Sequence, residues 1–294
     1  MAELLLREMN HLHTPVPLKE FLSFSCGWGE DMKKLKPWRK GGPGFMKSLS
    51  GEDQPRILIA GRTASLMDLI RAGEIPERIS GWDSMLAFMQ EEGRGRLGRK
   101  WSSLPGNITG ALRLPIPPEE YRSLLPLIIG YITASFISGQ GPSVKVKWPN
   151  DLILDSGKAG GILIEEKGGV IIAGIGINLY AAPEVSANDS PPEEYPPAAL
   201  SAYPAKLPGP VSFWSQLVKE IQIKYNYLTN NLTPGEFVKE FSSRMALLSE
   251  KILMTGPGGE EVRGLLTGLT EEGALRVSTE GGERIFLNGS LRPA

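Results

Sequence analysis

A loop rich in glycine and arginine is the part of this sequence best equipped for chemistry. It reads Gly93-Arg94-Gly95-Arg96-Leu97-Gly98-Arg99-Lys100-Trp101. Its glycines leave the backbone permissive, and each guanidinium offers a fork of donors to a phosphate or carboxylate. The loop lacks the Gly-Lys-Ser/Thr ending of a P-loop, and its arginines fall where a dinucleotide fingerprint needs bare backbone. A phosphate ligand, a nucleic acid and a merely solvated loop all remain compatible with this segment alone.

Three later segments can also bind an anion or a nucleotide. They are Val146-Lys147-Trp148-Pro149-Asn150-Asp151, Lys158-Ala159-Gly160-Gly161-Ile162-Leu163-Ile164-Glu165 and Gly174-Ile175-Gly176-Ile177-Asn178-Leu179. Asn150 and Asp151 follow a proline that fixes the chain between two strands, so they can hold a phosphate, a ribose or Mg²⁺. Lys158 can meet a carboxylate and an α-phosphate beside uncrowded glycines, and Asn178 ends a strand with hydrogen-bonding capacity. An ordinary Pro-Asn-Asp turn and a strand-edge lysine that discourages aggregation are the structural alternatives.

Composition limits the class of protein. The 294 residues, 41% of them hydrophobic, suffice for one large domain or for a large and a small one. The 32 basic and 33 acidic residues give a net charge of -1, so no general attraction to nucleic acid or membrane is expected. The lone Cys26 excludes an internal disulfide and fits a reducing cytoplasm. No apolar run approaches the roughly 20 residues that span a bilayer.

Hydrophobic spacing predicts the elements that must position these segments. Strands are expected over 56–60, 84–90, 107–115 and 143–148, and helices over 65–73 and 118–139. Three more strands follow between residues 151 and 180, separated by turn signals at 156–157 and 168–169. Such short turns favour antiparallel pairing, which indicates an α+β fold rather than a doubly wound one.

The two ends of the chain have a different character. Residues 1–55 contain a basic run and glycines, and we expect an irregular extension whose first 50 residues are dispensable for activity. Residues 181–210 are rich in proline, alanine and serine and are expected to form a surface loop. Helices are predicted over 211–228 and 235–248. From residue 250, short strands with glycine turns indicate a small β-barrel of about 45 residues.

The four segments, in this order and at these separations, resemble the catalytic domain of the biotin–protein ligases over about residues 56–248. The tail resembles the family's SH3-like barrel through VRGLLTGLTEEGALRV and NGSLRP. The resemblance implies a mixed, mostly antiparallel sheet flanked by helices, as in biotin/lipoate ligases. It divides the chain into an extension (1–55), a catalytic domain (56–248) and a C-terminal barrel (249–294). Residues 1–55 do not resemble the winged helix of bifunctional repressor-ligases, so we expect a monofunctional ligase.

The resemblance also implies a reaction. The carboxylate of biotin attacks the α-phosphate of ATP, with Mg²⁺, and gives biotinyl-5'-AMP and pyrophosphate. A lysine of a biotin carboxyl carrier protein then attacks the mixed anhydride. By match to the family's motifs, the catalytic residues would be Lys158, Arg94 and Arg96. Biotin or its adenylate would contact Ser65, Gln90, Gly93, Arg94, Arg96, Trp101, Lys158 and Gly160. The nucleotide would contact Arg99, Asn150, Asp151 and Asn178, with Asp151 also a ligand of Mg²⁺.

One segment departs from the family pattern. The usual Ser-Thr-Asn motif corresponds to Thr63–Asp68, where Leu66 and Met67 replace two polar residues near the ureido ring of biotin. Two other functions therefore stay open: a lipoate or octanoate transferase on the same fold, and a non-catalytic biotin or nucleotide sensor. The identity of the carrier and the oligomeric state, including a homodimer, also stay open. We expect a cytoplasmic protein that binds neither DNA nor membrane.

Overall fold

The computed structural model describes residues 3–7, 27–34, 38–42, 45–48, 56–72, 81–155, 157–184, 195–203 and 207–294. Within these residues, ten strands form one sheet in the order β2-β3-β1-β4-β5-β6-β10-β9-β8-β7. They are β1 (Glu3–Arg7), β2 (Trp38–Gly42), β3 (Phe45–Ser48), β4 (Arg56–Thr63), β5 (Ser84–Gln90), β6 (Ile108–Leu114), β7 (Val144–Lys147), β8 (Asp151–Leu154), β9 (Gly157–Lys167) and β10 (Val170–Ile177). The pairs β1–β4 and β4–β5 are parallel and the rest antiparallel. The antiparallel pairing predicted from the short turns and the mixed, mostly antiparallel sheet implied by the resemblance are both confirmed.

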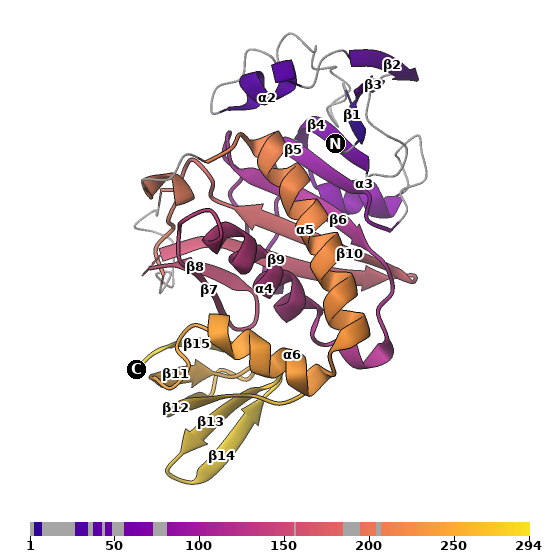
Figure 1. Ribbon diagram of the computed structural model, residues 1–294. Coiled ribbons are helices and arrows are strands. Elements are labelled where there is room, and N and C mark those ends of the chain that lie inside the picture. Colours follow the sequence, from indigo (N-terminus) through magenta and orange to yellow (C-terminus); the bar gives the residue numbers. More distant parts are fainter. Residues whose placement is uncertain are drawn as a thin grey trace.

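Helices cover both faces of this sheet (Figure 1). Alternate residues of β4 point to opposite faces, so Ile57 and Ile59 join one buried cluster whereas Leu58 and Ala60 join another. The larger cluster packs under α4 (Leu125–Ser138) and α5 (Pro210–Asn231). The smaller cluster packs under α3 (Leu66–Ala72). Helices therefore pack against both faces of the sheet.

Two predicted helices are shorter than expected. The helix predicted over 118–139 begins only at Leu125, after a 3-10 turn at Glu119–Tyr121, because Pro126 favours the first turn of a helix. The helix predicted over 235–248 is α6 (Pro234–Phe241), followed by a 3-10 turn at Ser242–Arg244. Parts of the predicted 181–210 loop lie outside the described residues. Within the described part, no helix is both long and apolar enough to cross a membrane.

The C-terminal region is a separate five-stranded antiparallel sheet in the order β14-β13-β12-β11-β15. Its strands are β11 (Lys251–Thr255), β12 (Glu261–Leu269), β13 (Leu275–Thr279), β14 (Gly282–Phe286) and β15 (Ser290–Pro293). Residues 249–294 are all described, and in them β14 and β15 remain the two edges of the sheet. The strands and turns were predicted, but the ladder does not close into the barrel we expected.

The N-terminal region differs from the irregular extension predicted for residues 1–55. The described part contains β1, β2, β3 and the helix α2 (Trp28–Lys34). The apolar run of β1 gives β4 a parallel partner, since Leu4, Leu5 and Leu6 pair with Ile57, Leu58 and Ile59. Trp28 and Met32 of α2 are buried in the larger core. Removing residues 1–50 would take this packing away, so we now expect such a truncation to reduce stability.

A buried carboxylate ties α2 to α5. Asp31 is 1% exposed, and its side chain accepts hydrogen bonds from the Ser212 amide (2.9 Å) and hydroxyl (2.8 Å) in the first turn of α5. Orphan N–H groups in that turn need such an acceptor. We expect Asp31→Ala to lower the free energy of unfolding by about 2 kcal/mol, or the melting temperature by about 5 °C. Thermal unfolding measures this, with Glu30→Ala on the exposed side of α2 as the control. Equal melting temperatures for the two variants would contradict the role.

Candidate active site

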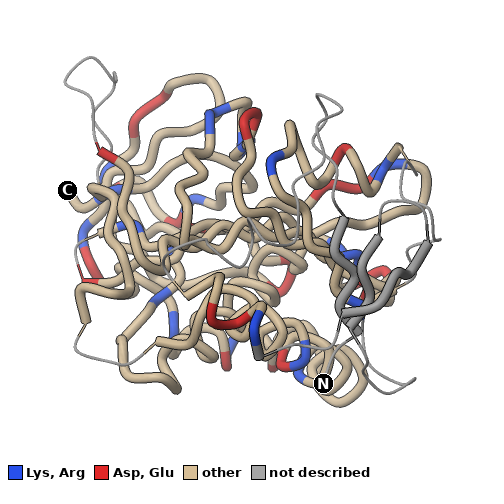
Figure 2. The backbone as a smooth tube through the Cα atoms, turned by 90° about the horizontal axis from the view of Figure 1, so that it is seen from above, with Lys and Arg blue, Asp and Glu red and all other residues tan. Residues whose placement is uncertain are grey.

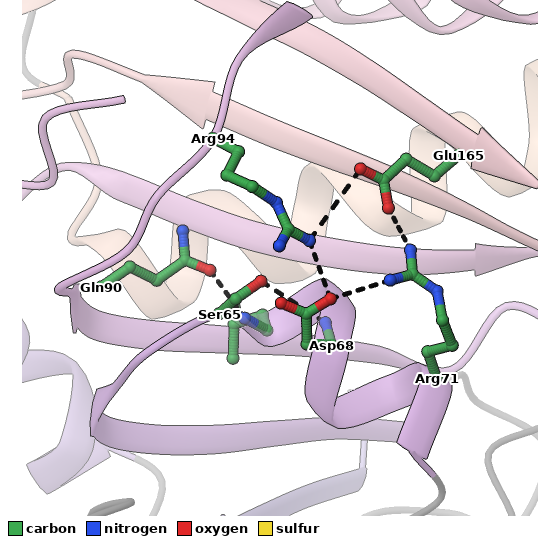
Figure 3. Close-up of polar contacts among 7 residues, drawn as sticks. Ser65, Asp68, Arg71, Gln90, Arg94 and Glu165 are labelled. Carbon is green, nitrogen blue, oxygen red and sulfur yellow. Dashed lines mark hydrogen bonds and ion pairs between the residues drawn. The ribbon is translucent and has the colours of Figure 1, made fainter. Parts of the chain in front are cut away.

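The first part of the site is the junction of β5 and α3. The Gln90 side-chain oxygen accepts a hydrogen bond from the Leu66 backbone amide at 2.7 Å. The Gln90 backbone amide donates to the Ser103 hydroxyl at 3.0 Å. Ser65 accepts a hydrogen bond from the Asp68 backbone amide at 3.4 Å, and a side-chain hydrogen bond from Ser65 also helps to lower the pKa of the Asp68 carboxyl. Because its oxygen is held by α3, the Gln90 side-chain nitrogen turns away from the helix (Figure 3). The Gln90 side chain can therefore donate to a polar ligand group.

Two carboxylates and two guanidiniums alternate next to this junction (Figure 3). Asp68 accepts from Arg94 at 2.7 Å and from Arg71 at 2.8 Å, and Glu165 pairs with Arg71 and lies 3.9 Å from Arg94. The hydrogen bond from Arg94 lowers the pKa of the Asp68 carboxyl, and the same bond raises the pKa of the Arg94 guanidinium. These four residues, the ion-pair quartet, join α3, β9 and the arginine loop. Arg94 is thereby held by protein carboxylates.

The arginine loop (residues 93–101) is folded back on itself. The Trp101 amide donates to the Gly93 carbonyl at 2.8 Å, and the Gly95 amide donates to the Arg99 carbonyl at 2.7 Å. A 3-10 turn at Arg96–Gly98 forms the tip, where Gly98 has φ +73° and Leu97 is 84% exposed. The hairpin shape needs the left-handed conformation that glycine adopts without cost. The loop closes through its backbone, and because Arg94 and Trp101 already have protein contacts, the exposed Arg99 and Lys100 are the cationic side chains left to a partner or ligand.

A glycine-covered stretch of the sheet lies beneath the loop. Gly174 and Gly176 of β10 point to one face, opposite Leu163 and Gly161 of β9. A Cβ at Gly176 would lie 2.4 Å from the Trp101 ring, and a Cβ at Gly174 would lie 2.7 Å from the Met67 sulfur. The glycines of this motif therefore make room for Trp101 and Met67 to lie directly on the sheet. We call this stretch, Gly161, Gly174 and Gly176, the glycine floor.

A second charged cluster lies at the start of β9. Lys158 is 3.0 Å from one oxygen of Asp151, and Lys147 is 3.6 Å from the other. The atoms nearest to a Cβ at Gly161 would be the Asp151 carboxylate at 3.7 Å, the Asn150 carbonyl at 3.8 Å and the Lys158 stem at 3.9 Å. The absence of that Cβ leaves the ammonium of Lys158 next to the glycine floor. The Lys158 ammonium thus stands where an acyl phosphate can be held, with the buried Lys147 on the far oxygen of Asp151.

The predicted asparagines and Arg96 surround this cluster. The Asn150 amide donates to the Ile162 carbonyl at 2.6 Å, and the Asn178 amide donates to the Lys158 carbonyl at 3.3 Å. Burial lowers the pKa of the Arg96 guanidinium, and the Asp151 carboxylate opposes that shift. Arg96 also lines a cavity of about 370 Å³ between the large sheet and the C-terminal sheet. This cavity is further bounded by Trp148, Pro149, Asn150, Gly273 and Leu287.

The structure sorts the predicted residues into two groups. Lys158, Gly160, Asn150, Asp151 and Asn178 gather with Arg96 around the start of β9. Ser65, Gln90 and Arg94 gather around α3, and Gly93 and Trp101 connect the groups through the loop. Arg94 and Lys158, both predicted to be catalytic, lie in different groups, since Arg94 pairs with Asp68 and Lys158 pairs with Asp151. Arg99 is exposed on the loop.

A resident Mg²⁺ does not fit the donors in the described residues. Asp151 already has an ammonium near each oxygen, and the described residues contain no group of three or more Asp, Glu, His or Cys side chains that could hold a metal ion. Two neighbouring positive charges oppose a third cation. We therefore derive no step through a metal held by the protein alone.

Several functional neighbours were missed from the sequence. Asp68, Arg71 and Glu165 carry no motif of their own, and only the fold brings them to Arg94. Lys147 lies within a recognised segment but had no assigned role. The hydroxyls of Ser103 and Thr109 are hydrogen-bonded at 2.8 Å, and the Ser103 hydroxyl also accepts from the Gln90 backbone amide. A short-range pattern cannot show the ion pairs, because Arg94 is 26 residues from Asp68 and Arg71 is 94 residues from Glu165.

The charges of the whole chain agree with a local rather than a general anion site. Figure 2 shows Lys and Arg positions interspersed with Asp and Glu positions along the described backbone. The balanced net charge of -1 predicts this mixture. Cationic side chains thus matter for their position at the arginine loop and the start of β9.

Comparisons with known proteins agree with this arrangement. The model of the biotin/lipoate A/B protein ligase family matches residues 83–180. A biotin–[acetyl-CoA-carboxylase] ligase of Paracoccus denitrificans is 28% identical over 219 residues, which cover 71% of this chain and 89% of that protein. The bifunctional ligase/repressor BirA of Escherichia coli is 41% identical over 120 residues, 38% of this chain and 36% of its own length. A biotin protein ligase from Aquifex aeolicus, solved with biotin and ATP, superposes with a TM-score of 0.67 at 26% identity and covers 81% of this chain and 99% of that one.

The fold and these matches agree on one class of protein. Over residues 83–180 the chain is similar to the biotin/lipoate A/B protein ligase family, and the relatives that match most of its length are named biotin protein ligases.

Proposed function

We propose that this chain activates biotin with ATP to biotinyl-5'-AMP and transfers the biotinyl group to a lysine of a biotin carboxyl carrier protein. The observation that carries the proposal is the placement of Lys158 and Asp151 beside the glycine floor, with Arg96 and Asn150 next to them. The Aquifex aeolicus relative was solved with biotin and ATP, and ammonium, guanidinium and amide groups are the donors that a carboxylate and a phosphate need.

The chemistry needs charge and orientation rather than a protein nucleophile. A carboxylate oxygen of biotin forms a bond to the α-phosphorus, and the bond to the leaving pyrophosphate breaks. The Lys158 ammonium would bridge the attacking carboxylate and the α-phosphate, and thereby reduce their mutual repulsion. The carrier's amine then attacks the acyl carbon, and AMP leaves. Arg96, half-buried at the cavity, would stabilise the phosphate charge in both steps.

The other end of the site would receive the ring system of biotin. Gln90 has side-chain N–H protons to donate to a ureido carbonyl, and Ser65 would donate to it in place of the Asp68 carboxylate. Leu66, one of the two departures from the family motif, contributes its backbone amide to Gln90, so its side chain is not needed for that contact. Met67, the other departure, packs over Gly174. Trp101 and Met67 would therefore flank the apolar acyl chain.

The same apolar cover favours one alternative, a ligase for lipoate or octanoate. Those acids lack the ureido group, so Ser65 and Gln90 would have no partner to bind. We therefore expect biotin to be the preferred acid. A panel of biotin, lipoate and octanoate with equal ATP separates the two assignments.

The test is biotin transfer to a recombinant carrier domain with ATP and magnesium, monitored by pyrophosphate release and by the mass of the acceptor. A mass increase of one biotinyl group on a single lysine supports the proposal. Pyrophosphate release with lipoate or octanoate alone would replace it by the alternative acid. No pyrophosphate release with any acid would favour a non-catalytic sensor.

Further assignments follow from the same proposal. We expect Asn178 and Arg99 to contact the nucleotide, and Mg²⁺ to arrive with the ATP phosphates rather than at a preformed site. The carrier domain is the macromolecular partner. The single cysteine supports a reducing cytoplasm as the compartment, and the balanced charge supports the expectation that DNA is not a partner.

A further inference from the structure

Lys147 is a buried ammonium that the proposed mechanism does not use. Lys145 and Lys147 are two residues apart on β7 and therefore point to the same face of the strand. Lys145 is exposed, whereas Lys147 is only 7% exposed. A lysine that could reach solvent is rarely buried without charged or polar partners, because desolvation of its ammonium is costly. The role of Lys147 can therefore be inferred from the groups that surround its ammonium.

These contacts come from three separate parts of the chain. Its ammonium donates to the Leu291 carbonyl of β15 at 3.4 Å, lies 3.6 Å from Asp151 and stands 5.2 Å from the centre of the Tyr195 ring. The following residue adds a second link to the C-terminal sheet, since the Trp148 ring nitrogen donates to the Gly273 carbonyl at 2.9 Å. The C-terminal sheet thus reaches the β7–β8 turn through two of its main-chain carbonyls.

Asp151 receives a lysine on each of its oxygens. Lys158 is 3.0 Å from one oxygen and Lys147 is 3.6 Å from the other. A carboxylate held at both oxygens has one orientation, whereas a carboxylate held at one oxygen can rotate about its side-chain bonds. The orientation of Asp151 in turn determines where the Lys158 ammonium lies.

We propose that Lys147 is a positioning residue, which couples the C-terminal sheet to Lys158 through Asp151. This inference rests on the proposed adenylation function and deepens it. Lys147 does not touch the reacting atoms. It fixes the carboxylate that holds the catalytic ammonium, and the Leu291 carbonyl fixes Lys147. The C-terminal sheet is then a working part of the adenylation site.

The test compares three variants of the full-length chain. Lys147→Met keeps the length of the stem and removes the charge, Lys147→Arg keeps the charge, and Lys145→Met removes an exposed charge from the same strand. The measurements are the melting temperature and, from pyrophosphate release at varied ATP and biotin, kcat and both KM values. We expect Lys147→Met to lower kcat about tenfold with a similar melting temperature and similar KM values. Lys147→Arg should recover part of the loss, and Lys145→Met should match wild type.

Other outcomes would overturn the proposal. An unchanged kcat for Lys147→Met would exclude positioning. A raised KM for ATP at unchanged kcat would instead indicate direct contact with the nucleotide, because uniform binding affects KM alone. Wild-type inactivity with every acid would refute the proposed function, which is a different result from a defect confined to Lys147→Met.

A double-mutant cycle checks the route of the coupling. If Lys147 acts through Asp151, adding Lys147→Met to an Asp151→Asn variant should cause little further loss in single-turnover adenylate formation. Independent roles would give multiplied losses instead, and that result would contradict the proposal. Equal melting temperatures of the single and double variants would exclude unfolding as the cause.

Discussion

Replacing Lys158 by alanine is expected to slow adenylate formation roughly a hundredfold, which corresponds to about 3 kcal/mol of lost transition-state stabilisation. The ammonium of Lys158 is 3.0 Å from Asp151 and lies beside the glycine floor, where two anions must approach each other. Alanine removes the charge that offsets their repulsion. The side chain is 24% exposed, so its truncation leaves no sealed cavity in the core. The effect should therefore appear in activity far more than in folding.

Pyrophosphate release in single-turnover experiments measures this effect, and the melting temperature reports folding. Lys167→Ala is the matched control, because Lys167 is an exposed lysine at the other end of the same strand. We expect that control to behave as wild type. Near-normal pyrophosphate release by a folded Lys158→Ala variant would remove Lys158 from the chemistry and would direct attention to Arg96.

Local patterns were sufficient to predict the part of the fold that carries the second charged cluster. The turns between β7, β8, β9 and β10 are short, so antiparallel pairing followed from chain length alone. Register then places Gly176 opposite Gly161, which explains why both motifs contain glycine. Both Lys158 and Asp151 were selected from their motifs, but their ion pair was not predicted, because register sets Asp151 opposite Gly161 and Lys158 opposite Ile153.

The contacts between distant segments could not be predicted in this way. Asp31 and Ser212 are 181 residues apart, and nothing in the sequence around Asp31 distinguishes a buried helix cap from an exposed acid. Arg94 was expected to face an anionic ligand, but Asp68 and Glu165 already lie within its reach. Likewise, strand alternation places Lys147 on the same face as the exposed Lys145, and contacts with β15 and Tyr195 bury it. Propensity describes a segment, whereas these roles depend on which segments meet.

The arginine loop joins both groups of site residues, and its attachment to the sheet is the contact between Trp101 and Gly176. A Cβ at residue 176 would come within 2.4 Å of two ring carbons and 2.9 Å of the ring nitrogen. Such distances do not occur between unstrained groups, so a larger side chain must displace the ring. Since the Trp101 amide also closes the loop onto Gly93, displacement of the ring would disturb the loop as a whole.

We expect Gly176→Val to weaken biotin binding about thirtyfold, or about 2 kcal/mol, because overpacking of a close contact costs that much. Calorimetric titration of biotin measures the affinity, and hydrogen exchange of residues 93–101 should show faster exchange in the variant. Ile175→Val, which changes the opposite face of β10, is the control and should leave both measurements near wild type.

A double variant tests the cause. Once Trp101→Ala has removed the ring, Gly176→Ala should add little to the loss of affinity, since the two side chains would no longer collide. Wild-type affinity in Gly176→Val would mean that biotin binds without the ring lying on Gly176.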